Sequence, residues 1–272
     1  MANWRGVAGG DINEAYRCEL DDGSLCFLKA NPTARPEMFE VEALGLKWLR
    51  EAGALRVPEV LACSRAGDTS SFLMLEWLEP GRPSRDFDDV LGRGLAKLHA
   101  AAAPEFGLDH DNFIGSLPQE NHPTATWAEF FWSRRLEPQL RRAVSLGRVS
   151  LLMRRGFQEL ERRIPRLLGE VKSSSRLHGD LWSGNVHVDD RGEPCLIDPA
   201  AYGGHREVDL AMLRLFGGTS QRVFDAYAEA LPLETGAQER VGLYQLYPLL
   251  VHVNLFGGSY VSSVERALKT YV

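Results

Sequence analysis

Short runs in which apolar and polar residues alternate dominate the first part of the chain and predict a small antiparallel sheet. Such alternation places successive side chains on opposite faces, as in a strand that is buried on one side. Glycine, aspartate and asparagine mark turns between these runs. We expect strands in three stretches: residues 6–30, which hold three of them, residues 57–62 and residues 71–78.

A repeat of about 3.6 residues replaces the alternation elsewhere and predicts helices. One helix, residues 36–52, lies among the predicted strands. The others are expected at residues 88–103, 127–146 and 151–168, near residue 206, and as two helices between residues 231 and 270. Residues 106–123 have no periodicity and are rich in Gly, Asn, Asp and Pro, which predicts a loop. The second helix of the series carries arginines that are expected on a solvated face, namely Arg134, Arg135, Arg141 and Arg142.

These elements predict an α+β fold in two lobes. Proline and glycine at positions 80 and 81 break the pattern after the last strand and mark the boundary. We expect residues 1–78 to form an N-terminal lobe with an antiparallel sheet and one helix. Residues 79–272 are expected to form a mainly helical C-terminal lobe.

Composition narrows the class of protein. A chain of 272 residues with 44% apolar and 25% charged residues is an ordinary globular protein. A formal charge of −6 argues against a nucleic-acid partner. No signal-peptide core opens the chain, and residues 243–256 are too short and too polar to span a bilayer. Four cysteines without CxxC spacing favour reduced thiols. We therefore expect a cytoplasmic protein, and the lack of a spanning segment predicts no membrane partner. We also expect a monomer.

The strongest chemical signal lies at residues 178–198. Asp180 is followed by Asn185 and then by Asp198, with two short apolar runs and a turn between the last two. This pattern predicts a hairpin whose open ends face the same way, so the three side chains can converge. In kinases such an array supplies the base for the acceptor hydroxyl and the magnesium ligands. The alternative is a turn in which the same side chains cap backbone groups.

A lysine and a glutamate occupy faces that should be apolar. Lys29 shares its strand face with Leu25 and Phe27, and Glu42 lies in the apolar stripe of helix 36–52. A carboxylate on a packing face is costly unless it is paired, so we expect Lys29 to be its partner. In kinases such a pair holds the amine over the α- and β-phosphates. A gatekeeper lysine on an edge strand, or an unrelated salt bridge, is the alternative.

Two further segments are candidates for nucleotide contacts. Gly9 and Gly10 would let backbone N–H groups approach phosphate oxygens, although an ordinary tight hairpin also explains them. The backbone from Glu76 to Leu78, at the lobe boundary, is available to an adenine edge. The side chain of Glu76 is equally compatible with facing solvent.

Asp209 lies one turn inside a predicted helix and is expected to be buried and to brace the catalytic loop. His99 is expected to be a packed, hydrogen-bonded histidine. His252 lies in an apolar segment, where a structural role is the commoner one.

With these residues in view, the sequence resembles the fructosamine kinase (ketosamine 3-kinase) family, within the wider protein-kinase-like group of aminoglycoside and choline phosphotransferases. The similarity extends over almost the whole chain, and its most specific parts are residues 178–185 and 198–200. Further matching segments are residues 9–13, 113–116, 206–212, 215–218 and 252–258, with Gln119, Asn121, Trp127, Arg135 and Leu136.

The resemblance implies ATP-dependent phosphorylation of the sugar 3-hydroxyl of a ketosamine, which is a sugar adduct of a small amine or of a protein lysine. The 3-phosphate is unstable and releases the amine, so the process is a deglycation repair. By resemblance, Asp180 accepts the hydroxyl proton, Asn185 and Asp198 hold Mg²⁺, and Lys29 with Glu42 positions the phosphates of ATP.

The resemblance also implies a sugar site lined by Trp182, His252 and Asn254, although Trp182 is equally compatible with core packing. Many eukaryotic members carry a cysteine in the glycine turn that supports a redox-linked dimer. Asp11 stands there in this chain, so we expect no such switch. Two alternatives stay open: an aminoglycoside- or choline-type phosphotransferase, and an inactive nucleotide-binding scaffold.

Overall fold

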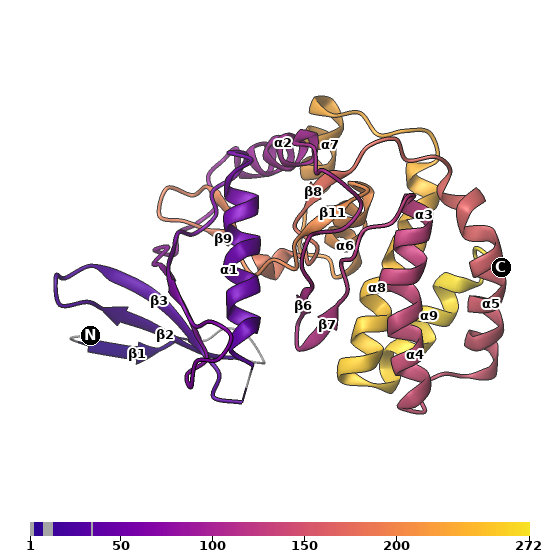
Figure 1. Ribbon diagram of the computed structural model, residues 1–272. Helices are drawn as coiled ribbons and strands as arrows, with labels where there is room; N and C mark the ends of the chain where they lie inside the picture. The colour runs from indigo at the N-terminus through magenta and orange to yellow at the C-terminus, as the bar shows by residue number, and fades with distance from the viewer. Residues whose placement is uncertain (1–2, 8–12, 34) are drawn as a thin grey trace.

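The computed structural model describes residues 3–7, 13–33 and 35–272, and it has two parts that lie side by side (Figure 1). The N-terminal part is a five-stranded antiparallel sheet in the order β1-β2-β3-β5-β4, with one helix, α1 (Pro36–Arg50), beside it. Its strands are β1 (Asn3–Gly6), β2 (Glu14–Glu19), β3 (Leu25–Ala30), β4 (Val60–Cys63) and β5 (Phe72–Glu76).

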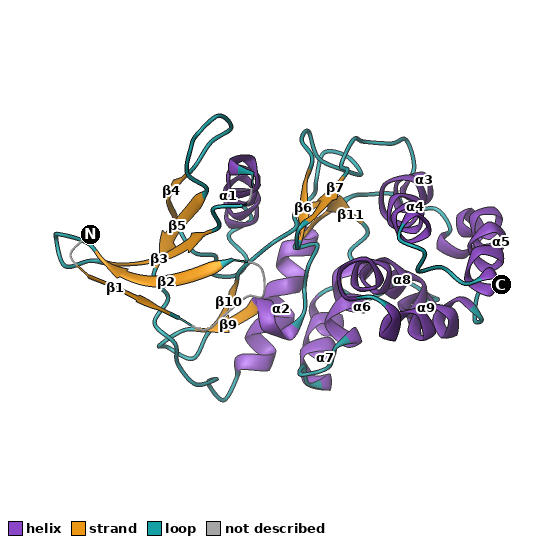
Figure 2. Cartoon of the chain, turned by 90° about the horizontal axis from the view of Figure 1, so that it is seen from below, coloured by secondary structure: helices purple, strands orange, loops and turns teal. Residues whose placement is uncertain are grey.

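The C-terminal part is mainly helical (Figure 2). Its α-helices are α2 (Phe87–Ala100), α3 (Trp127–Phe130), α4 (Glu137–Ser145), α5 (Leu151–Leu168), α6 (Glu207–Leu215), α7 (Gln221–Ala230), α8 (Ala237–Phe256) and α9 (Val261–Leu268). A π-helix, η1 (Phe131–Leu136), joins α3 to α4, and two 3₁₀ turns are η2 (Ser183–Asn185) and η3 (Gly258–Tyr260).

Three short antiparallel strand pairs lie in this helical part. They are β6 (Asn112–Ile114) with β7 (Leu117–Gln119), β8 (Ser175–Leu177) with β11 (Tyr202–Gly204), and β9 (Val186–Val188) with β10 (Pro194–Leu196). The α+β class, the N-terminal sheet and the β9–β10 hairpin agree with the sequence-based prediction.

The predicted loop at residues 106–123 is wrong in one respect, because it contains the β6–β7 hairpin. Polar side chains of the hairpin anchor it to the backbone of the next segment. Asn112 donates to the carbonyl of Ala201 at 2.8 Å, and Gln119 donates to that of Ala200 at 3.0 Å. Tertiary hydrogen bonds rather than local periodicity therefore define these strands.

One hydrophobic cluster crosses between the two parts and fixes the hairpin relative to the sheet. The cluster contains Leu46 and Leu49 of α1, Leu95 of α2, Leu196 of β10 and Leu181, which precedes η2. All five side chains are buried. A second cluster fills the helical part around Trp127 and helices α5, α8 and α9.

Composition predicts reduced thiols and no membrane-spanning segment. All four cysteines are free thiols, as predicted. Within the described ranges, no helix combines the length and the apolar character needed to cross a membrane.

Arg135 corrects the expectation of a solvated arginine face. It lies in η1 and is fully buried, with its guanidinium carbon 3.8 Å from the ring centre of Tyr202. Its N–H groups donate to the carbonyl of Glu120 at 2.6 Å and to Oδ1 of Asn121 at 2.7 Å. No carboxylate of the described residues lies within ion-pair distance. Carbonyl dipoles and an aromatic face therefore stabilise this cation.

We predict that Arg135→Lys lowers the free energy of unfolding by about 2–4 kcal/mol, because an ammonium cannot reproduce the planar fork and leaves Asn121 or Glu120 without its donor. Chemical denaturation measures the change. Arg134→Lys, at the neighbouring half-buried position, is the matched control and should change stability by less than about 1 kcal/mol. Equal effects of the two substitutions would contradict the special role of Arg135.

Candidate active site

The β9–β10 hairpin brings the three polar residues of the catalytic segment together. The side-chain nitrogen of Asn185 donates to the Asp180 carbonyl at 2.8 Å and lies 3.2 Å from Oδ2 of the same residue. It also lies 3.4 Å from the carbonyl of Asp198. Asn185 thus holds both aspartates at the open end of the hairpin. The β9–β10 hairpin itself lies beside α2 (Figure 2).

Asp198 has an unusual backbone conformation. Its φ of 56° is the one positive value found among non-glycine residues in the described ranges. Such a left-handed residue costs free energy and persists only where its surroundings hold it. His178 supplies that support on both sides, because its ring donates to the carbonyl of Ile197 at 2.9 Å and its carbonyl accepts from the Ala200 N–H at 3.0 Å.

His178 also supports Asp180 through its other ring nitrogen. Nδ1 lies 3.3 Å from the backbone nitrogen of Asp180 and accepts from its N–H, while Nε2–H donates to Ile197. Burial lowers the pKa of His178, with Asp209 opposing the shift, so the neutral ring that these bonds require is favoured. Sequence reasoning assigned no role to His178, although its place two residues before Asp180 was a usable signal.

Lys29 of β3 is the link between the sheet and the hairpin. Its ammonium lies 2.8 Å from Oε1 of Glu42 in α1 and 2.6 Å from Oδ1 of Asp198. Burial alone would lower the pKa of Lys29, but the two carboxylates outweigh it and raise the pKa above its usual value. The pair with Glu42 was predicted from the sequence. The contact with Asp198 was not, because it depends on how the two parts dock.

Asp209 of α6 braces the catalytic loop from behind, as expected. Its carboxylate is fully buried and accepts from the backbone N–H groups of His178 at 2.7 Å and Gly179 at 2.9 Å. His99 donates to it at 3.1 Å from Nε2. Burial raises the pKa of Asp209, but the bonds from His99 and the loop outweigh burial and lower it. Gly179 has a φ of 81°, and a Cβ there would lie 2.0 Å from the carbonyl of Ala200.

The surroundings of Asp180 raise the pKa of its carboxylate toward neutrality. Burial, and then the neighbouring charge of Asp198, raise the pKa of Asp180 to about 7, while the bond from Asn185 opposes the shift. Part of its surface stays open to solvent. A carboxylate with a pKa near neutrality is suited to accept a proton.

At the lobe boundary, the side chain of Glu76 is bonded to other protein groups. This side chain is partly exposed, but its carboxylate is engaged: one oxygen pairs with Arg56 and the other accepts from the N–H of Glu59 at 2.9 Å. Arg56 also pairs with Asp189, in the β9–β10 turn, at 2.7 Å. Leu78 is buried at the start of the segment that leaves β5. Glu76 therefore ties the sheet to the hairpin.

The candidate sugar residues fall into two groups. Trp182 and His252 both contact Phe216, with ring centres at 6.4 Å and 4.7 Å. Asn254 is not brought to them, since it is buried and donates to the backbone and side-chain oxygens of Gln139 at 2.9 Å and 2.7 Å. Residues two apart on a helix point to nearly opposite sides, which explains the separation.

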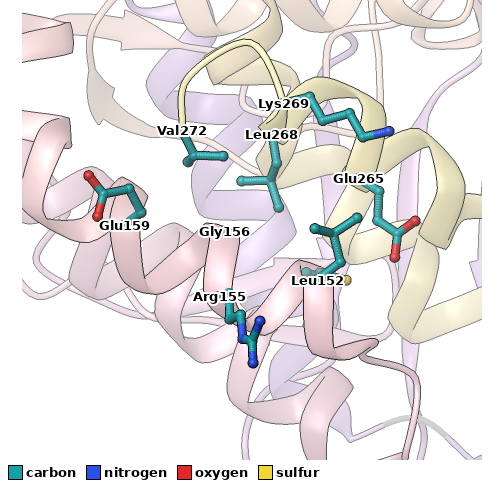
Figure 3. Close-up of a pocket in the computed structure, with 9 residues that line it drawn as sticks. Leu152, Arg155, Gly156, Glu159, Glu265, Leu268, Lys269 and Val272 are labelled. Atoms are coloured by element: carbon teal, nitrogen blue, oxygen red, sulfur yellow. The ribbon is translucent and has the colours of Figure 1, made fainter.

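The glycines of the first turn, Gly9 and Gly10, lie outside the described residues, as does Asp11. The described residues hold no cluster of three or more His, Cys, Asp or Glu side chains with the arrangement of a metal site. A surface groove of about 250 Å³ between α5 and α9, lined by Leu152, Gly156 and Leu268 (Figure 3), includes none of the candidate site residues.

Comparisons with known proteins show the family to which the chain belongs. The family model described as fructosamine kinase matches residues 1–272. A probable ketoamine kinase of Enterococcus faecium is 40% identical over 269 residues and covers 97% of this chain and 94% of that protein. A chloroplastic protein-ribulosamine 3-kinase of Oryza sativa is 39% identical, with 98% of this chain and 78% of that protein covered.

Solved structures share the fold. A crystal structure from Thermobifida fusca that is assigned to fructosamine-3-kinase has a TM-score of 0.90 and 39% identity, covering 99% of this chain and 93% of that one. The aminoglycoside phosphotransferase APH(4)-Ia has a TM-score of 0.65 at 16% identity, with 99% and 93% covered, which shows a common kinase-like fold alone. The fold is thus the bilobal kinase-like α+β fold that the sequence predicted. The chain belongs to the fructosamine kinase family.

Proposed function

We propose that this protein is an ATP-dependent kinase that phosphorylates the 3-hydroxyl of ketosamines, the fructosamine or ribulosamine adducts of amines or protein lysines. The observation that carries the proposal is the buried ammonium of Lys29, joined to Glu42 and Asp198 beside Asp180. Relatives named ketoamine kinase and protein-ribulosamine 3-kinase, at 40% and 39% identity, support a ketosamine as the acceptor. Breakdown of the 3-phosphate would then release the amine and repair the glycated group.

The donor site lies between a nucleotide-binding lobe, residues 1–78, and a catalytic lobe, residues 79–272. Lys29, positioned by Glu42, neutralises phosphate charge of ATP. Gly9 and Gly10 are assigned the phosphate contacts because glycines let backbone N–H groups approach phosphate oxygens, and the backbone from Glu76 to Leu78 receives the adenine edge. The side chain of Glu76 takes no part in this, because it is already paired with Arg56.

Asp180 is the group that acts on the acceptor. Its carboxylate accepts the proton of the sugar 3-hydroxyl as that oxygen forms its bond to the γ-phosphorus. The bond from the γ-phosphorus to the bridging oxygen breaks, and ADP leaves with the electron pair. Since phosphoryl transfer depends mainly on positioning and charge stabilisation, Asn185 contributes by fixing the orientation of Asp180.

The charges of the site fit a magnesium ion. Glu42 and Asp198 share the single ammonium of Lys29, the carboxylate of Asp180 lies near enough to Asp198 for that charge to raise its pKa, and ATP adds further negative charge. Mg²⁺ is typically held by one or two carboxylates together with substrate phosphates, so a cluster of three protein carboxylates is not needed. Asp198 and the amide oxygen of Asn185 would hold it. The ion would neutralise the phosphates in the transition state.

Trp182 and His252 are the proposed sugar residues. The indole of Trp182 is 39% exposed and begins two residues after Asp180, so an apolar sugar face can stack on it beside the reacting hydroxyl. The ring of His252 donates to the Pro248 carbonyl at 2.8 Å, which leaves Nε2 to bind a hydroxyl. Asn254 lies outside this group, because its side-chain nitrogen donates to Gln139.

A substrate panel tests the proposal directly. We expect phosphorylation of fructosamines and ribulosamines of lysine, with the phosphate on O3 when it is located by NMR. Aminoglycosides and choline should give rates at least about a hundredfold lower in kcat/KM, a difference that corresponds to about 2.7 kcal/mol. Turnover of aminoglycosides without turnover of any ketosamine would refute the acceptor, and binding of ATP without any turnover would identify a scaffold.

We predict that Asp180→Asn lowers kcat by about 10²–10⁴-fold and yet raises the thermal stability at pH 8. The folded pKa of about 7 lies above the usual value of 3.8, so above pH 7 the ionised carboxylate destabilises the folded state. Asparagine removes that charge and should add about 1–2 kcal/mol of stability, since part of the group stays open to solvent. Calorimetry and initial rates measure the two effects. Asp190→Asn, at an exposed position of the same hairpin, should change neither, and wild-type kcat in Asp180→Asn would remove the assigned base.

Metal dependence has a readout that is separate from activity. We expect ADP with Mg²⁺, at about a hundred times its Kd, to raise the Tm of the protein by roughly 3–8 °C. EDTA should abolish most of this shift. Asp198→Asn tolerates the left-handed backbone and should retain the fold but lose the Mg²⁺-dependent part. A full shift in the variant would show that Asp198 does not hold the ion.

A further inference from the structure

Two neighbouring helices end in the same four residues. α6 runs into Leu215-Phe216-Gly217-Gly218 and α8 into Leu255-Phe256-Gly257-Gly258, and the two helices pack together. Gly217 and Gly257 have φ angles of 72° and 90°, and α6 ends at Leu215, just before its phenylalanine, whereas α8 ends at Phe256 itself. Phe256 lies one turn after His252 in α8 and Phe216 approaches the same ring from the end of α6, with ring centres at 5.4 Å and 4.7 Å from His252.

These rings form a continuous aromatic row, which consists of Trp182, Phe216, His252, Phe256 and Tyr260. Tyr260 lies 4.9 Å from His252 and 6.2 Å from Phe256, measured between ring centres. Trp182 marks the end of the row that is nearest in sequence to Asp180. Phe256 and Tyr260 form the outer end.

The aromatic row is open to solvent to an unusual degree. Four tryptophan or phenylalanine side chains are exposed in the part of the chain that the structure describes, and three of them lie in this row. They are Trp182 at 39%, Phe216 at 37% and Phe256 at 56%. Exposed aromatic surface gathered beside a proposed active site indicates a binding surface.

The row carries no charge near neutral pH. Burial lowers the pKa of His252, and the one opposing influence is the carbonyl of Pro248. The ring faces of this surface suit an alkyl chain or a cation held over a ring.

The chemistry of a ketosamine matches the order of the rings. Its nitrogen is separated from the 3-hydroxyl by three carbon atoms, or about 4–5 Å. With the sugar on Trp182, the protonated nitrogen lies over the inner rings. The carbon chain that carries the nitrogen then continues toward Phe256 and Tyr260.

We propose that Phe256 and Tyr260 form a subsite for the alkyl carrier of the ketosamine nitrogen. This subsite favours adducts of long, unbranched alkyl amines, such as the lysine side chain, over adducts of short amines. The inference rests on the proposed function and adds a specificity-determining surface to it.

The test is a series of ribulosamines made from methylamine, butylamine and hexylamine. Half-burial of the five added methylene groups corresponds to a gain of roughly thirtyfold in kcat/KM from methyl to hexyl. In Phe256→Ala that ratio should fall to about twofold, and Phe256→Tyr should restore it. Leu152→Ala is the control, because Leu152 is 54% exposed but lines the groove between α5 and α9 (Figure 3), and it should leave the ratio at its wild-type value.

A ratio close to one in the wild type would overturn the subsite, as would an unchanged ratio in Phe256→Ala. General damage to the fold lowers kcat/KM for all carriers alike, so it leaves the ratio unchanged and counts against the proposal. Failure of every ketosamine to react would instead contradict the proposed function. The two results are therefore distinguishable.

Discussion

The buried positive charge of Lys29 is the constraint on which the docking of the two lobes depends. A side chain that is only 9% exposed cannot keep an ammonium charge without close carboxylates. Glu42 comes from the helix of the sheet lobe and Asp198 from the hairpin of the helical lobe. The charge of one residue in β3 therefore requires that α1 and the β9–β10 hairpin meet at one point. Close packing supports this, because a Cβ on Gly45 of α1 would lie 3.4 Å from the Cβ of Ala201.

The segment around Asp198 is held by polar groups from several directions. His178 bonds on both sides of the left-handed residue. Further along the segment, Asn112 and Gln119 donate to the carbonyls of Ala201 and Ala200. These bonds offset the cost of the strained conformation, which is about 1–2 kcal/mol. The side chain of Asp198 stays partly open as a result, while its backbone cannot move independently.

Sequence reasoning succeeded where a residue contradicted its local pattern. Lys29 and Glu42 were each out of place on an apolar face, so they predicted each other, and the turn between β9 and β10 placed Asp180 and Asp198 together. It failed for Arg135, because helical periodicity assumes 3.6 residues per turn and the π-helix changes which side chains point inward. The contact between Lys29 and Asp198, and the role of Glu76 as a partner of Arg56, depend on the docking of distant segments, which local patterns do not encode.

The paired endings of α6 and α8 also limit how the length of these helices can vary. Successive residues of an α-helix differ by about 100° in direction. Inserting or deleting a single residue of α8 before His252 would turn His252, Phe256 and Gly257 together away from Phe216 at the end of α6, even if the core contacts of the helix stayed apolar. Substitutions along these helices can be absorbed by repacking, but changes in length cannot. The arrangement of the aromatic row therefore depends on the number of residues in these helices as well as on the identity of its rings.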